Sequence, residues 1–206
     1  MTASAAMDEA LGELEDALAS VGHRWVEGAE PGLDLDEIQA EVSRIGLTFP
    51  DELAALWQWH ANPPPADWRT EGFLPGQFFY PRLAEVIDFH LEARDAELLG
   101  DGLPLAQTWV PALRQPGLVF WADTRVGTAD AVPLTPVVMA DIEGYAEQSR
   151  AARVPSITAI VGDWVRMLAE GHWGRYQPLG VDHLVWCRNP ELGDVSDREL
   201  GYTWAI

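Results

Sequence analysis

Histidine and cysteine side chains, which could bind a metal ion or act as nucleophiles, are few in this 206-residue chain, and their spacing suits neither task. His183 and Cys187 are four residues apart, as metal ligands on a helix would be, but the surrounding segment 181–187 reads as a strand. Residues four apart in a strand lie ~13 Å from each other, too far to share an ion. No glycine-rich phosphate loop, nucleophile elbow or His-Glu-x-x-His pattern occurs. We therefore expect a non-catalytic protein without a bound metal or cofactor.

Two carboxylates, Asp123 and Asp130, flank a polar segment that we expect to join two strands. The segment lacks the ligand order and the closing glutamate of a calcium loop. Exposed loops on a rigid framework often carry binding residues. Both aspartates are therefore candidates for contact with a protein partner.

The chain has ten tryptophans, and Trp68 is unusual because it stands in a polar loop between Asp67 and Glu71. An exposed tryptophan beside carboxylates suits either a sugar platform or an anchor in a protein interface, where tryptophan is enriched. Alternatively, Trp68 packs on its own domain. We take Asp67, Trp68 and Glu71 as further candidates for partner binding.

Acidic residues dominate the charge, with 33 Asp and Glu against 13 arginines and no lysine, a net charge of −20. Residues 1–52 hold 13 of the acids and only two arginines, Arg24 and Arg44. Such a surface repels phosphate backbones, which argues against nucleic-acid binding. We expect no secretion signal and no membrane span, and the single cysteine, Cys187, favours a cytoplasmic location.

The apolar pattern predicts helices over residues 7–21, 34–45, 50–61, 82–99 and 156–170, and strands over 118–122, 131–134 and 181–187. This mixture, which does not alternate strictly, indicates an α+β fold. The first helix has a single apolar stripe made of Met7, Leu11, Leu14, Leu18 and Val21. Two heptads are too few to support a coiled coil, so we expect this helix to lie on the core of its own domain.

The order of these features resembles a known family. Residues 45–62, in which Pro50 opens a leucine-rich helix that ends near Asn62, are similar to the N-terminal signature of the SUKH superfamily in its cell-wall-assembly-regulator branch. Segments 109–111, 120–123 and 170–173 resemble its later motifs. The likeness covers residues 35–175, and Pro63 departs from it because the family has glycine there. The acidic N-terminal helix and the tail from residue 180 are additions.

The resemblance implies a single α+β domain with a small twisted, mostly antiparallel sheet flanked by helices. We divide the chain into an acidic helix and connection at 1–33 and a SUKH-like domain at 34–206, packed as one unit. Bacterial members of the family resemble immunity proteins that neutralise toxins, often nucleases. An acidic surface suits a basic toxin domain. An immunity protein is therefore the leading hypothesis; a regulatory scaffold of the same fold and a carbohydrate-active enzyme using paired carboxylates are the alternatives.

Overall fold

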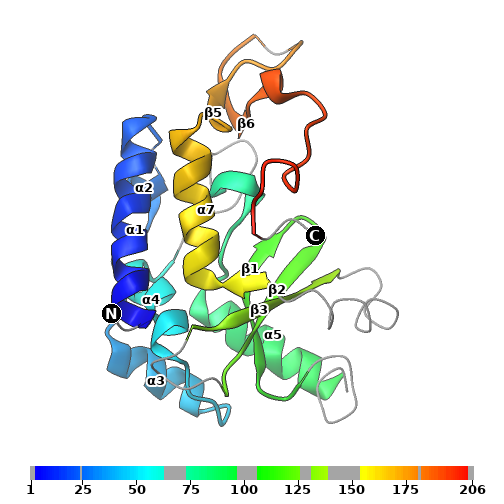
Figure 1. Cartoon of the computed structure of the whole chain (residues 1–206). Helices are drawn as coiled ribbons and strands as arrows, with labels where there is room; N and C mark the ends of the chain where they lie inside the picture. The colour runs from blue at the N-terminus through cyan, green and yellow to red at the C-terminus, as the bar shows by residue number, and fades with distance from the viewer. Residues whose placement is uncertain are drawn as a thin grey trace.

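The computed structural model describes residues 3–23, 25–62, 73–96, 106–125, 131–138, 154–180 and 182–203. Helices surround a small antiparallel sheet, which confirms the predicted α+β class (Figure 1). The helices are α1 (Ala3–Ser20), α2 (Trp25–Gly28), α3 (Leu35–Ser43), α4 (Asp51–Trp59), α5 (Leu83–Asp95) and α7 (Ile157–Ala169), with short 3-10 turns η1 (Pro75–Gln77) and η3 (Pro190–Leu192).

Four antiparallel strands form the main sheet in the order β1-β2-β3-β4, and two more form a separate hairpin. The strands of the sheet are β1 (Trp109–Gln115), β2 (Leu118–Asp123), β3 (Pro133–Val138) and β4 (Val154–Ser156), and those of the hairpin are β5 (Trp173–Tyr176) and β6 (Val185–Arg188). Pro116 and Gly117 connect β1 to β2, and the φ of +79° at Gly117 suits a glycine in this tight turn.

Both faces of the sheet are covered, as the alternation of side chains along β2 shows. Phe120 and Ala122 are buried in the main core, which the helices α1, α4 and α7 share. Val119 and Trp121 point to the opposite face and pack against α5, where the ring centroid of Phe89 lies 5.6 Å from that of Trp121. Side chains alternate along a strand, so a continuous buried run indicates a sheet with two covered faces.

Helix α1 lies on the core through the stripe that the sequence predicted. Met7, Leu11, Leu14 and Leu18 are each at most 3% exposed and belong to the main core, which confirms that expectation. The helix packs beside α4 and α7 (Figure 1). Of the helices described here, none is both long enough and apolar enough to cross a membrane.

A close backbone contact holds the segment after α2 against the end of α4. A Cβ atom placed on Gly32 would lie 1.7 Å from the carbonyl oxygen of Gln58, so only glycine fits this approach. Next to this contact, the amide of Leu33 donates to the carbonyl of Trp57 at 2.9 Å. These two contacts hold the segment that joins α2 to α3 against the last turn of α4.

The carboxylate of Glu52 is buried at the junction of α4, α7 and the start of β3. It accepts hydrogen bonds from the backbone amide of Thr158 at 2.9 Å, from the Thr158 hydroxyl at 2.5 Å and from the backbone amide of Val132. Thr158 lies in the first turn of α7, whose amides have no partner within the helix. The carboxylate of Glu52 also lies at the positive end of the α7 dipole.

Several predicted boundaries were wrong. The helix predicted over 34–45 is the shorter α3 (Leu35–Ser43), and its first residue, Leu35, is 36% exposed because only the later turns meet the core. Helix α5 ends at Asp95, although the apolar pattern extended to Leu99; residues 97–100 are outside the described part. The predicted strand at 181–187 is the shorter strand β6, which begins at Val185.

The sequence interpretation missed strands β1, β4 and β5. Strand β1 contains Pro111, which lowers strand propensity, and the register shifts between Pro111 and Leu113 to accommodate it. Strands β4 and β5 are three and four residues long, too short to show an alternating pattern. The helix start at Ser156 was confirmed, since its hydroxyl accepts from the amide of Ala159 at 3.3 Å.

Replacing Leu14 with alanine should lower the free energy of unfolding by about 2–5 kcal/mol, because it opens a cavity in a fully buried position. The matched variant is Gly12→Ala on the same helix, where an added Cβ meets no atom within 4 Å. It should raise stability by about 0.5–1 kcal/mol. Urea unfolding measures both, and an unchanged midpoint for Leu14→Ala would contradict the packing of α1.

Replacing Glu52 with alanine leaves the buried amides of Thr158 and Val132 without their acceptor, which should cost about 3 kcal/mol or more. The neighbouring variant Asp51→Ala removes a half-buried carboxylate from the first turn of α4 and should cost only about 0.3–1 kcal/mol. Thermal unfolding of both variants tests the difference. Equal losses would show that Glu52 does not hold the junction together.

Candidate functional site

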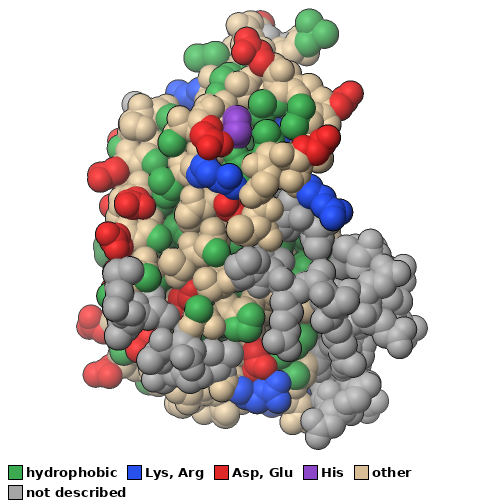
Figure 2. Space-filling model, in the orientation of Figure 1, with side chains coloured by type: hydrophobic (Ala, Val, Ile, Leu, Met, Phe, Trp, Pro, Cys, Tyr) green, Lys and Arg blue, Asp and Glu red, His purple; other side chains and the backbone are tan. Residues whose placement is uncertain are grey.

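The strongest concentration of charge in the described structure lies on α1, α3 and the segment between them. The exposed carboxylates here, which we call the acidic surface, belong to Asp8, Glu9, Glu13, Asp16, Glu27, Glu30, Asp34, Asp36, Glu37 and Glu41. Within residues 3–52 as described, Arg44 is the one basic side chain, and it pairs with Glu41 at 2.8 Å. Figure 2 shows acidic side chains along the edge of the molecule where Figure 1 places α1 and, below it, α3.

A groove of about 290 Å³ runs between α1 and α4 beside this surface. Its floor includes Gly12, whose missing side chain leaves open space, and carboxylates stand at its rim. The residues of this α1–α4 groove are Ser4, Asp8, Leu11, Gly12, Glu15, Ala55, Gln58 and Trp59. An aromatic ring, an amide and two carboxylates therefore meet in one concave site.

Trp59 is held rigidly at the end of the groove. Its indole Nε1 donates to the carboxylate of Glu15 at 2.5 Å, which joins α4 to α1. Its ring stacks on that of Trp25 with a centroid distance of 4.7 Å and an interplanar angle of 13°. The Nε2 atom of His60 lies 3.3 Å from the same Glu15 oxygen, and its Nδ1 lies 3.0 Å from the backbone oxygen of Glu30.

The structure places Trp59 against α1 and α2. Sequence reasoning did not connect Trp59 with Glu15, which is 44 positions away in the chain. The acidity of residues 1–52 was the signal that pointed to this region. No local pattern indicates which of its carboxylates meets an aromatic side chain.

Most of the residues singled out as partner-binding candidates, Asp67, Trp68, Glu71 and Asp130, lie outside the described part of the chain. The remaining candidate, Asp123, ends β2. Its carboxylate accepts from the hydroxyl of Thr108 at 3.0 Å and pairs with the Arg125 guanidinium at 2.7 Å. Asp123 is thus bonded to its own chain and closes the turn after β2.

Burial raises the pKa of Asp123, but the hydrogen bonds from Arg125 and Thr108 and the positive charge of Arg125 outweigh it. The pKa of this carboxyl therefore lies below its ordinary value. The ionised form is favoured in the folded state.

His183 and Cys187 do not form a common site. His183 is exposed in the bend before β6 and its Nδ1 lies 2.9 Å from Asp182, whereas Cys187 is half-buried within the strand. Burial raises the pKa of the Cys187 thiol. Among the residues that the structure describes, no three His, Cys, Asp or Glu side chains are grouped so as to hold a metal ion.

No protein-family model matches this chain, and no curated protein matches it in sequence.

The lowered pKa of Asp123 predicts a pH-dependent contribution to stability. Because the carboxyl binds its proton more weakly in the folded chain, its contribution is complete above the unfolded pKa of about 3.9. It is lost as the pH falls through the lower folded value. Urea unfolding of the native chain and of Asp123→Asn should differ most near neutral pH and converge below that range. A difference that stays constant with pH would contradict the ion pair with Arg125.

Proposed function

We propose that this protein is a non-catalytic protein-binding module of the immunity type, which neutralises a basic toxin domain by covering it with the acidic surface. The observation that carries the proposal is the run of exposed carboxylates on α1 and α3, which has a single arginine among its described neighbours. A nuclease domain is a suitable partner, because proteins that bind nucleic acid carry clustered positive charge.

The exposed carboxylates of Glu9, Glu13 and Asp16 on α1 repel one another. Glu9 and Glu13 are four residues apart and Asp16 follows three later, so like charges stand next to one another on the helix surface. Such pairs destabilise a helix by about 0.2–0.5 kcal/mol each. A basic partner removes this repulsion when it binds, which supports a role for these charges in association.

The α1–α4 groove supplies a place for one basic side chain of the partner. The methylene groups of a lysine or arginine can lie along the ring of Trp59, while its charged end reaches Asp8 or Glu15 at the rim. Trp59 is already fixed by Trp25 and Glu15, so little conformational freedom is lost on binding. The groove thus adds a specific contact to the long-range attraction.

Long-range attraction acts mainly on the rate of association. The field of exposed carboxylates extends about 8 Å at physiological ionic strength and further in dilute salt. Complementary charges speed the encounter, whereas close contacts in the interface determine how slowly the partners separate. Neutralising the surface and truncating Trp59 should therefore have different kinetic effects.

We predict that the variant Glu9→Gln/Glu13→Gln/Asp16→Asn associates more slowly with its toxin than the native chain, with little change in dissociation. The difference should shrink as salt is added. The partner to use is a basic toxin domain sought among the proteins encoded directly beside its gene, with surface plasmon resonance for rates and cell survival for protection. The matched control is Glu92→Gln/Glu191→Gln/Asp194→Asn, which removes three exposed charges outside the acidic surface.

The control should retain the native association rate and protection. Equal slowing by both triple variants would mean that net charge alone matters, which would overturn the assignment of the surface. A chain that binds its partner without protecting cells would favour the regulatory scaffold over the immunity protein.

Truncation of the groove's aromatic side chain gives a separate prediction. Trp59→Ala should raise the dissociation rate at least tenfold if the ring anchors a basic side chain, since central aromatic contacts cost about 2 kcal/mol or more when removed. Trp59→Phe keeps an aromatic face and should retain most of the affinity. A dissociation rate unchanged in both variants would remove the groove from the interface.

A further inference from the structure

The loop between β5 and β6 stands at the end of the molecule where α2 also lies (Figure 1). It holds Leu179 and Leu184, the two most exposed large hydrophobic side chains of the described residues, which are 104% and 59% exposed. Figure 2 shows hydrophobic and acidic side chains together on the surface of this end. Single exposed leucines are common on proteins, whereas their concentration in one place indicates an interaction surface.

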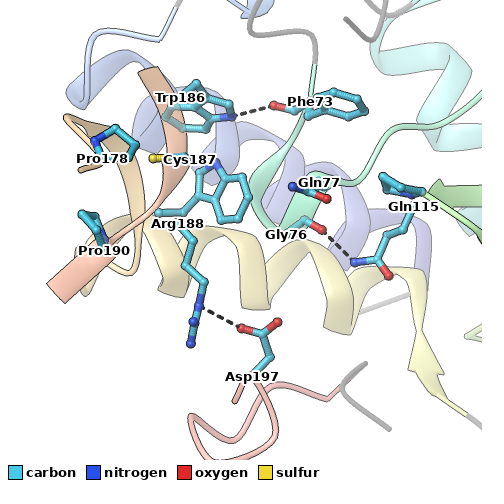
Figure 3. A pocket seen from close by; sticks show the side chains of 12 residues that line it. Phe73, Gly76, Gln77, Gln115, Pro178, Trp186, Cys187, Arg188, Pro190 and Asp197 are labelled. Atoms are coloured by element: carbon cyan, nitrogen blue, oxygen red, sulfur yellow. Dashed lines mark hydrogen bonds and ion pairs between the residues drawn. The ribbon is translucent and has the colours of Figure 1, made fainter. Parts of the chain in front are cut away.

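The base of this loop is held firmly to the rest of the molecule. The indole of Trp186 in β6 donates to the carbonyl of Phe73 at 2.8 Å (Figure 3), and its ring meets that of Trp173 edge to face with centroids 6.2 Å apart. At the end of β5, the hydroxyl of Tyr176 donates to the carbonyl of Gly171 at 2.5 Å. The loop is therefore carried by a fixed hairpin, and its leucines do not fold back onto the core.

The loop also carries a charge between its two leucines. The side chain of Asp182 is fully exposed, and the Nδ1 atom of His183 lies 2.9 Å from its carboxylate. Among loop residues 177–180 and 182–184, which the structure describes, Asp182 is the one acidic residue, and no arginine occurs. The loop thus presents apolar surface on either side of a single negative charge.

The hairpin packs directly on the connection between α1 and α2. The ring of His23, which follows α1, lies with its centroid 4.0 Å from that of Trp186. The Nδ1 atom of His23 accepts from the amide of Trp25, the first residue of α2, at 3.0 Å. Helix α2 carries the exposed Glu27 of the acidic surface. The acidic surface therefore continues to the hairpin, and one partner can contact both.

Charge decides which partner fits the loop. A second copy of this chain would bring two acidic surfaces together, and the net charge of −20 on each copy opposes that contact. A basic protein is instead attracted to this end of the molecule. Stable interfaces also need desolvated apolar contacts. Of the described side chains on α1, α2 and α3, only Leu35 is large, hydrophobic and exposed, so the acidic surface supplies few such contacts itself.

We propose that the β5–β6 loop is the apolar anchor of the interface with the basic partner. Leu179 and Leu184 enter an apolar depression on that partner, and Asp182 faces a lysine or arginine at the rim of the depression. The inference rests on the proposed function, because it assigns the loop to the same partner as the acidic surface. It adds what that partner must present: an apolar depression bordered by positive charge.

The first test is the variant Leu179→Ser/Leu184→Ser, with the basic toxin domain used for the acidic surface as the probe. Its dissociation rate should rise about tenfold or more, because apolar anchors limit the separation of partners. Its association rate and the dependence of that rate on salt should stay native, since no charge is removed. Leu179→Ser alone changes only a fully exposed side chain, so it should raise the dissociation rate without lowering the unfolding midpoint.

The matched control is Val195→Ser, which removes an apolar side chain that is 40% exposed and lies outside the loop. It should leave both rates native. A second measurement places the photoreactive residue p-benzoylphenylalanine at position 179 or at position 195 of the full chain. Irradiation should join the toxin domain to the chain modified at 179 and not to the one modified at 195.

The outcomes separate this inference from the proposed function. If the toxin domain binds and the acidic triple variant slows its association, but the loop variants dissociate at the native rate, the loop is not an anchor and the acidic surface stands. Equal acceleration by the loop variant and Val195→Ser would also overturn the anchor. If no basic protein encoded beside the gene binds the native chain, both proposals fail. A dimer in sedimentation velocity that the loop variant abolishes would make the loop a contact between copies, contrary to the proposal.

Discussion

A buried carboxylate, that of Glu52, connects three parts of the molecule that are far apart in sequence. It joins α4 to Val132, 80 positions along the chain, and to Thr158, 106 positions along. A buried charge without partners is costly, and so are the amides at the start of α7 without an acceptor. The hydrogen bonds to Glu52 therefore hold α4 and α7 against each other, and the one from Val132 ties the start of β3 to both.

Helix α7 carries a second buried carboxylate, Asp163, which accepts from the amide and hydroxyl of Thr203 at 2.6 and 2.7 Å. Asp163 also pairs with Arg166 at 3.0 Å, and the guanidinium of Arg166 lies 4.5 Å from the centre of the Tyr202 ring. These contacts hold the C-terminal segment on α7. One helix thus packs against α1 on one side and holds residues 201–203 on another.

Periodic sequence patterns predicted the long helices well, because an amphipathic helix of three or more turns repeats its apolar positions several times. The apolar stripe on α1 is an example of such repetition. Short strands repeat too little to be recognised, and β1 was hidden by Pro111, which the sheet accommodates with a register shift. Of the candidate sites, the sequence indicated the acidic region but not the groove, since Trp59 and Glu15 meet only when α1 packs beside α4.

The sequence by itself determined the α+β class, the apolar face of α1 and the excess of negative charge near the N-terminus, because these properties depend on composition and on spacing within one element. The tertiary structure alone decided which polar groups far apart in the chain would meet. Glu52 and Thr158 are ordinary residues in the sequence. They become partners because α4 and α7 pack together in the core, where burial removes the water that would otherwise satisfy the carboxylate and the amide.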